Sequence, residues 1–224
     1  MSYLKSHWQL LALTAVIFAL WQTPVVIPLK ILVVFLHELS HALAAWLTGG
    51  SVTQISLSPQ QGGFAITRGG NVFVILSAGY LGSLLLGVAL LMTALRSQMD
   101  RMVIAGLGIV MALVTVFYVR DLFAVAFCTI GAAALIAMAR FLGHAANDMT
   151  LRVIGLSSMI YVPYDIYDDT IARRRVQSDA QMLADNFGGT AAIWGGLWLL
   201  VSVAVIIWCL RRGLGSTSNL TLSP

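Results

Sequence analysis

Long apolar runs follow one another along this chain of 224 residues, and they constrain its fold more than any other feature. Crossing the roughly 30 Å hydrocarbon core of a bilayer takes about 20 apolar residues. Hydrophobic residues make up 59% of the chain and charged residues only 10%, whereas soluble domains carry about 25% charged residues. We therefore expect an all-α polytopic membrane protein, folded as a single membrane-embedded domain over residues 1–224 with its core at about 29–210.

Seven segments are candidates for membrane helices by length and hydropathy. They lie at about 8–27, 29–47, 71–95, 102–119, 122–141, 150–167 and 190–210. The number of spans is six or seven, depending on whether 8–27, which Pro24 interrupts, and 150–167 cross completely. Lys and Arg residues are almost evenly divided between the loops of the two sides, so their numbers leave the orientation open.

The segment 51–70 has a different pattern from the apolar runs around it. Polar and apolar residues alternate from Ser51 to Leu57, and Pro59, Gly62 and Gly63 precede a second short apolar stretch. Alternation bounded by Gly and Pro predicts a β-hairpin. Because exposed strand edges are tolerated at membrane depth only against protein or water, we expect a re-entrant or interfacial position for it.

The charge of the chain is basic, with a formal net charge of +4. Its Lys and Arg residues stand mostly singly between apolar runs, with a pair at 211–212 and a triplet at 173–175. That distribution is typical of charges at the ends of membrane helices. We expect a lipid bilayer as the surroundings, no nucleic-acid partner and no organic cofactor.

One short motif carries the chemistry. The only glutamate of the chain, Glu38, stands between two of its four histidines in His37-Glu38-Leu39-Ser40-His41. On a helix, the two imidazoles project from one face, one turn apart, and can bind one Zn²⁺. A glutamate beside the first histidine can act as general base on the water that the metal activates. We therefore predict His37 and His41 as metal ligands and Glu38 as the catalytic residue.

The surroundings of this motif strengthen the prediction. Apolar residues flank it at 31–36 and 42–47, so it lies inside a membrane helix. Ionisable residues there cost about 3 kcal/mol or more unless they are paired or hydrated, and they mark functional sites. Two other interpretations stay open: a structural polar cluster in which Glu38 bonds to a histidine, and a metal site without hydrolysis.

A catalytic zinc usually takes three protein ligands and leaves one position for water, so a third ligand is required. A second glutamate is excluded because the chain has none, and residues 42–50 contain no histidine of the metzincin kind. We favour Asp165, since it follows a largely apolar run and we expect Pro163 to break the helix just before it. An acidic helix end at the membrane surface is the other interpretation of this region. The remaining candidates are Asp168, Asp169, Asp179, Asp121, His7, His144 and Cys128.

Several motifs between about residues 30 and 200 follow the order seen in one known protein family. They are the His-Glu-Leu-Ser-His-Ala stretch at 37–42, Leu-Thr-Gly-Gly at 47–50, the Gly-rich hairpin, Ser-Ala-Gly-Tyr-Leu-Gly-Ser at 77–83, Tyr-Asp-Ile-Tyr-Asp-Asp at 164–169 and Ser-Asp-Ala at 178–180. In these motifs the chain resembles the site-2 protease family of intramembrane zinc metalloproteases, and especially its small peptidase "B-like" branch.

The resemblance implies zinc as cofactor, His37 and His41 as ligands, Glu38 as catalytic glutamate and Asp165 as the distal aspartate ligand. It also implies that the hairpin is an edge strand able to bind an unwound substrate by β-addition. The chain departs from the usual pattern at two places. No Gly follows Asp165, and Gly-Tyr-Leu-Gly at 79–82 stands where typical members carry an Ala-Gly-Pro-x-x-Asn stretch.

The sequence thus predicts a zinc-dependent intramembrane endopeptidase that hydrolyses a peptide bond in or near the membrane span of a protein substrate. It assigns no substrate-binding residues. The alternatives are a zinc or divalent-metal transporter and a non-catalytic membrane scaffold with a zinc site. A transport path requires further His or acidic residues in neighbouring spans, and 71–95 and 102–119 contain none. We expect a multi-pass protein of a bacterial inner membrane.

Overall fold

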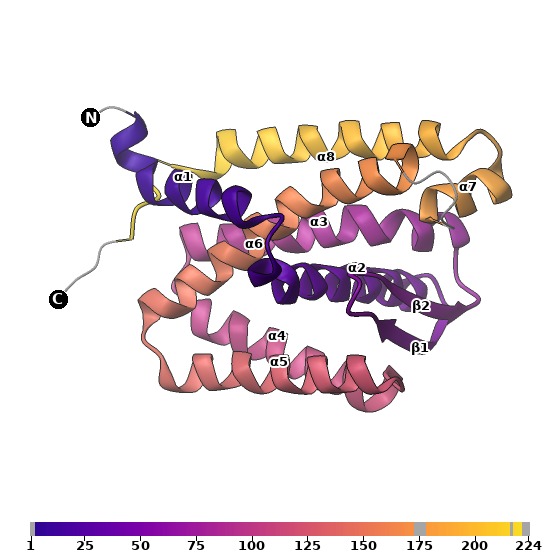
Figure 1. The fold of residues 1–224 in the computed structure, drawn as a ribbon, viewed down its shortest axis with the longest axis horizontal. Coiled ribbons are helices and arrows are strands. Elements are labelled where there is room, and N and C mark those ends of the chain that lie inside the picture. Colours follow the sequence, from indigo (N-terminus) through magenta and orange to yellow (C-terminus); the bar gives the residue numbers. More distant parts are fainter. Residues whose placement is uncertain (1–2, 173–177, 216, 221–224) are drawn as a thin grey trace.

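The computed structural model of the protein describes residues 3–172, 178–215 and 217–220, so the arginine triplet at 173–175 lies outside the described residues. Figure 1 shows long helices lying side by side, with one small hairpin at one end of the bundle. In chain order the elements are α1 (Tyr3–Leu20), the 3-10 turn η1 (Pro24–Val26), α2 (Ile27–Leu47), β1 (Ser51–Leu57), β2 (Gly63–Arg68), α3 (Val72–Arg96), α4 (Asp100–Tyr118), α5 (Leu122–Phe141), α6 (His144–Tyr167), the π-helical turn η2 (Asp168–Ala172), α7 (Asp179–Phe187) and α8 (Ala191–Gly213).

The helical, polytopic fold predicted from the apolar runs is confirmed. Among the described residues, five helices are long and apolar enough to cross a membrane, namely α3, α4, α5, α8 and the combined η1–α2 segment. The expected span at 8–27 corresponds to α1, which is apolar but shorter than these five helices. It runs in a similar direction to α2, so the two do not form an antiparallel pair of spans (Figure 1). The expected span at 150–167 belongs to α6, which carries charged residues along its length.

Proline has opposite effects at two places in the bundle. Pro24 interrupts the chain between α1 and α2 as predicted, where it begins the 3-10 turn, and Pro28 lies in the first turn of α2. Pro163, by contrast, lies inside α6, which continues to Tyr167. The expectation that Pro163 breaks the helix before Asp165 is therefore wrong. Helices tolerate an internal proline in a bundle when neighbouring elements compensate for its missing hydrogen bond.

The predicted hairpin is confirmed at β1 and β2, which pair in antiparallel register from Ser51–Arg68 to Leu57–Gly63. The hairpin packs against α2, and its residues Ile55 and Leu57 are buried. In addition, the Ser56 hydroxyl donates to the Asp121 carboxylate at 2.7 Å, which fixes β1 to the start of α5. The hairpin therefore lies directly beside the helix that carries the His-Glu motif.

The core is centred on α2, which packs against α3, α6 and both strands. Phe35 and Leu36, just before the motif, are fully buried there. Close packing of α3 against α6 is made possible by Gly87 and Gly155, where a Cβ atom would lie under 3.0 Å from the opposite helix. The motif side chains thus project from a helix that is enclosed on most of its sides.

Candidate metal centre

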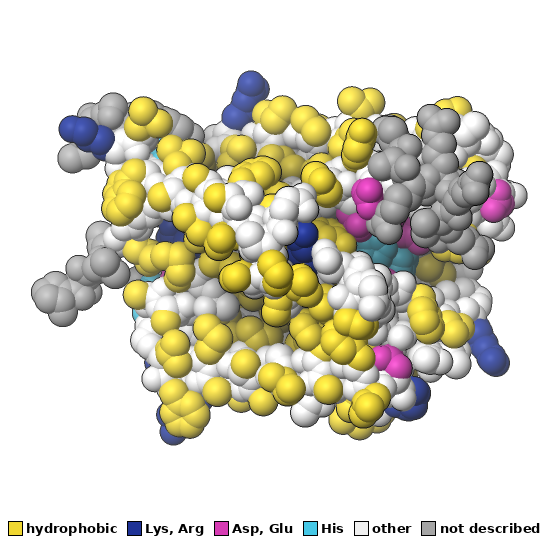
Figure 2. Space-filling model, in the orientation of Figure 1, with side chains coloured by type: hydrophobic (Ala, Val, Ile, Leu, Met, Phe, Trp, Pro, Cys, Tyr) yellow, Lys and Arg dark blue, Asp and Glu magenta, His cyan; other side chains and the backbone are white. Residues whose placement is uncertain are grey.

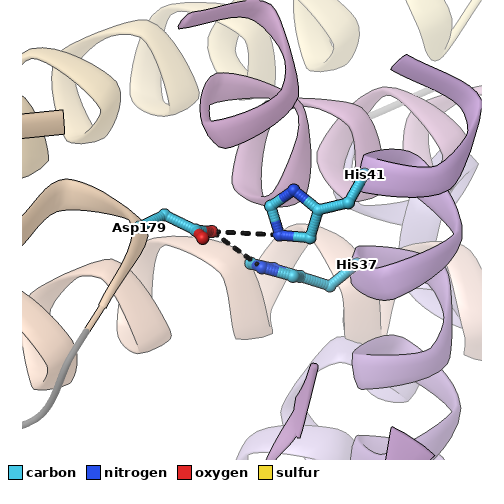
Figure 3. A group of neighbouring side chains, drawn as sticks. All are labelled: His37, His41 and Asp179. Atoms are coloured by element: carbon cyan, nitrogen blue, oxygen red, sulfur yellow. Dashed lines mark hydrogen bonds and ion pairs between the residues drawn. The ribbon is translucent and has the colours of Figure 1, made fainter. Parts of the chain in front are cut away.

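Two histidines and one aspartate converge at the end of the bundle that carries the hairpin and α7. Nε2 of His37 lies 3.0 Å from Oδ2 of Asp179, and Nε2 of His41 lies 3.2 Å from the same oxygen (Figure 3). The exposed fractions of the three side chains are 12%, 8% and 8%, respectively. As the i, i+4 spacing predicts, both imidazoles leave α2 from one face.

The donor set of this cluster suits a zinc ion. The three candidate ligand atoms lie within 4.8 Å of one another. Ligands of a tetrahedral zinc lie about 3.3 Å apart, given metal–ligand bonds of about 2.0 Å. Nδ1 of His41 lies 2.7 Å from the backbone oxygen of Ile75. If Nδ1 carries the proton for that hydrogen bond, Nε2 is left with a lone pair for a metal, as is usual for histidine ligands.

Gly79 on α3 provides the space that this cluster occupies. A Cβ atom at position 79 would clash with Nε2 of His37 and lie 2.6 Å from Nε2 of His41. No side chain larger than hydrogen fits there without moving both imidazoles. The backbone of α3 therefore forms one wall of the metal centre.

Glu38 is buried next to the hairpin, with an exposed fraction of 4%. A Cβ atom on Gly63 would lie 2.7 Å from Oε1 of Glu38 and 2.9 Å from Cγ1 of Val34. The backbone of β2 thus approaches the carboxylate closely, and the position requires glycine. Glu38 and the three candidate ligands all line one cavity of about 520 Å³. In the space-filling view, histidine and acidic side chains are visible together on a face otherwise covered largely by hydrophobic ones (Figure 2).

Tyr80 contacts the cluster from α3. Its ring meets the ring of His37 edge-on, with centroids 4.7 Å apart and an interplanar angle of 86°. Its hydroxyl donates to Oδ2 of Asp169 at 2.7 Å. Tyr80 therefore links the histidine ligand to the turn η2, which leads toward α7. Sequence reasoning assigned no role to Tyr80 or to Gly63.

The structure brings Asp179, rather than Asp165, to the two histidines. Asp165 lies in the last turn of α6 and lines the same cavity, as does Asp169, but neither belongs to the group of mutually close ligand atoms. Because α6 continues through Pro163, Asp165 stays on that helix, whereas Asp179 is presented from the first turn of α7.

A local signal for this position exists in the sequence. Ser178 and Gln181 have the spacing of a capping box, and the Ser178 hydroxyl accepts a hydrogen bond from the backbone N–H of Gln181. This pattern marks the start of α7. Asp179 therefore stands in the first turn of a helix, where a carboxylate is favoured.

The charge state of Asp179 is set by its neighbours. Burial by itself would raise the pKa of the Asp179 carboxyl, but the nearby imidazoles of His41 and His37 outweigh burial and hold that pKa below its usual value. The carboxylate is thus the ionised form that binds a metal.

The other candidate ligands lie elsewhere. Nδ1 of His7 is 2.9 Å from the hydroxyl of Ser218, and Cys128 is buried in α5. Asp121 caps α5 by accepting a hydrogen bond from the backbone of Ala124. His144 contacts Asp100 at the opposite end of the bundle.

Comparison with known proteins gives one match: the model of the peptidase M50B-like family fits residues 10–209. The chain belongs to this family. Its members are site-2 protease relatives, so the resemblance noted in the sequence is confirmed, and the family suggests intramembrane metalloprotease activity for this M50B-like protein. Neither curated proteins nor solved structures include a significant match.

Proposed function

We propose that this M50B-like protein is a zinc-dependent endopeptidase that hydrolyses a peptide bond in or near the membrane span of a protein substrate. The observation that carries the proposal is the convergence of His37, His41 and Asp179 in the cavity that Glu38 also lines. Two imidazoles and one carboxylate are a common donor set for a catalytic zinc with one position left open.

Each of these side chains has a distinct role in the proposal. His37, His41 and Asp179 hold the zinc, which when bound supplies Lewis-acid activation of water and of the scissile carbonyl. Glu38 accepts a proton from the attacking water at its carboxylate and later delivers a proton to the departing amine nitrogen. Burial of Glu38 against β2 holds it in place for both transfers.

The hairpin is the proposed substrate-binding element. Gly63, Phe64, Ala65, Ile66 and Thr67 of β2 line the cavity. Within the described residues β2 pairs with β1 alone, so its second edge has no strand neighbour. An extended substrate segment added to that edge would gain backbone hydrogen bonds. A helix has to unwind to bind in this way, so the proposed substrate is a membrane protein cut where its span is extended.

The location of the protein in the cell is part of the proposal. The apolar helices and the family support an integral multi-pass membrane protein, and we propose a bacterial inner membrane as its place.

Cleavage of a single-span substrate by the purified full-length protein tests the proposal. In detergent, we expect zinc-loaded protein to cut the substrate within or beside its span, with the new ends identified by mass spectrometry. A chelator should stop the reaction, and added Zn²⁺ should restore it. When the protein is reconstituted in liposomes, we expect it to transport no zinc across the membrane. Zinc uptake without cleavage would favour a transporter, and stoichiometric zinc with neither activity would favour a scaffold.

A further inference from the structure

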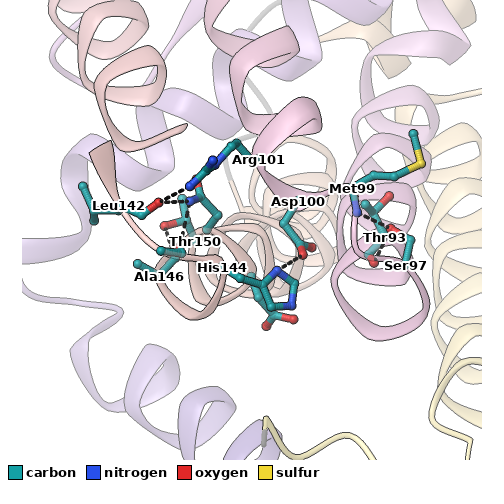
Figure 4. A network of polar contacts seen from close by, with 12 residues as sticks. Thr93, Ser97, Met99, Asp100, Arg101, Leu142, His144, Ala146 and Thr150 are labelled. Atoms are coloured by element: carbon teal, nitrogen blue, oxygen red, sulfur yellow. Dashed lines mark hydrogen bonds and ion pairs between the residues drawn. The ribbon is translucent and has the colours of Figure 1, made fainter. Parts of the chain in front are cut away.

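A second group of histidine and carboxylate side chains lies at the opposite end of the bundle from α7, where α4 and α6 begin (Figure 1). Nδ1 of His144 is 2.9 Å from Oδ2 of Asp100 (Figure 4). Asp148 stands one turn after His144 on α6, and one ligand atom from each of the three residues lies within 4.8 Å of the others. This group shares no residue with the candidate metal centre.

Three buried oxygen atoms at this end accept no hydrogen bond among the described residues. They are both carboxylate oxygens of Asp100 and Oδ1 of Asn147, and both residues are 0% exposed. Of the three, Oδ2 of Asp100 has an ion-pair contact, with His144. Asn147 follows His144 by three positions, so the two lie on the same face of α6. Buried oxygens without donors are rare in folded proteins and point to an ion or water that satisfies them.

The charges of the group leave one carboxylate uncompensated. The guanidinium of Arg152 binds Asp148 through two nitrogens and also donates to the backbone oxygen of Ser218. Asp100, which is completely buried, has no such partner when His144 is neutral. Buried charges are retained in proteins when they are paired or bind a metal.

Protonation of His144 would neutralise Asp100 but would leave the donor problem unsolved. A protonated imidazole offers one N–H from Nδ1, the nitrogen that lies 2.9 Å from Oδ2 of Asp100. The Oδ1 atoms of Asp100 and Asn147 would still have no donor. A bound cation can satisfy both oxygens, either by coordinating them directly or through a water molecule that it holds.

We propose that Asp100, His144 and Asp148 bind a divalent transition-metal ion of the Zn²⁺ or Mn²⁺ kind, with the amide oxygen of Asn147 supporting it. One imidazole with carboxylate oxygens suits these metals. The His144 side chain is 55% exposed, which gives the ion a route from solvent, while the aspartates hold it from the protein side. The ion fastens the start of α4 to the start of α6.

Zinc stoichiometry of the full-length protein in detergent tests this site. Metal-free protein is equilibrated with Zn²⁺, freed of excess and measured by elemental analysis. We expect Asp100→Asn and His144→Arg to hold one zinc per chain less than the unchanged protein. Asp185→Asn, which removes an exposed carboxylate that belongs to neither cluster, is the matched control and should hold as much zinc as the unchanged protein.

His144→Arg is the decisive variant because it places a permanent positive charge beside Asp100 but removes the ligand. We expect it to lose the zinc-dependent rise in melting temperature that the unchanged protein shows, while its melting temperature in chelator stays unchanged. Asp179→Asn should retain this zinc, so the two sites can fail separately. Equal zinc content in His144→Arg and the unchanged protein would overturn the proposal and leave a His144–Asp100 ion pair.

Discussion

The two histidine–aspartate clusters at opposite ends of the bundle contain the same kinds of side chain, yet their surroundings differ. At the hairpin end, His37, His41 and Asp179 face a cavity of about 520 Å³, and Glu38 lines the same space. At the other end, the corresponding carboxylate Asp148 is bound by Arg152. This difference indicates that the types of ligand alone do not make a catalytic centre. Space for a substrate and a general base beside the ligands are also needed.

The hairpin-end cluster also depends on glycines that the other cluster lacks. Gly79 leaves space for the two imidazoles, and Gly63 leaves space for Glu38. Replacing either residue should therefore damage function, while comparable changes elsewhere in the same kinds of element should have little effect.

Gly79→Ala should abolish cleavage and also zinc binding at His37, His41 and Asp179. The added Cβ would displace the imidazoles of His37 and His41 together, because it meets Nε2 of each. Gly106→Ala in α4 is the matched control, since a Cβ there meets nothing within 4 Å. Zinc content and substrate cleavage are measured on both variants. Full zinc occupancy in Gly79→Ala would show that α3 does not wall the metal centre.

Asp179→Asn should weaken zinc binding by more than about 100-fold, because loss of an outer-shell partner alone costs roughly 10- to 100-fold. Asp165→Asn should leave zinc affinity within a few-fold of the unchanged protein. Competition with a chromophoric chelator gives both affinities. A larger loss of zinc affinity in Asp165→Asn than in Asp179→Asn would identify Asp165 as the third ligand.

Gly63→Ala should reduce turnover by about 10- to 100-fold with zinc retained, because a misplaced general base loses part of a contribution of roughly 100- to 10,000-fold. The control is Gly62→Ala, one residue before β2, where a Cβ would lie 3.5 Å from the Ser58 hydroxyl, an ordinary contact. Equal turnover in the two variants would show that close packing of β2 against Glu38 is not needed for cleavage.

Tyr80→Phe should have the smallest effect, a decrease in turnover of about 10-fold or less. The ring contact with His37 is kept, and only the hydrogen bond to Asp169 is lost. Tyr118→Phe on α4 is the control, because Tyr118 does not line the cavity. A loss of zinc in Tyr80→Phe would mean that the hydroxyl supports the metal centre itself.

Much of the fold could be predicted from the sequence because its signals are local. Apolar runs located the helices, and alternation bounded by Gly and Pro located the hairpin. The effect of Pro163 could not be predicted, since packing of α6 against its neighbours decides whether a helix bends or ends there.

The candidate site divides in the same way. His37, Glu38 and His41 lie within five residues, so their spacing on a helix was enough to group them. A capping box marks the start of α7, but no local pattern specifies that α7 brings Asp179 to the two histidines. The roles of Gly79 and Gly63 depend on contacts between elements distant in the chain, and hydropathy carries no information about such contacts.

The most direct test of the central claim is cleavage by Glu38→Gln measured beside its zinc content. This substitution keeps the size of the side chain but removes the carboxylate that accepts the proton from water. We predict that the variant binds as much zinc as the unchanged protein and cuts a single-span substrate at least about 100 times more slowly. Cleavage by Glu38→Gln at the unchanged rate would contradict the account.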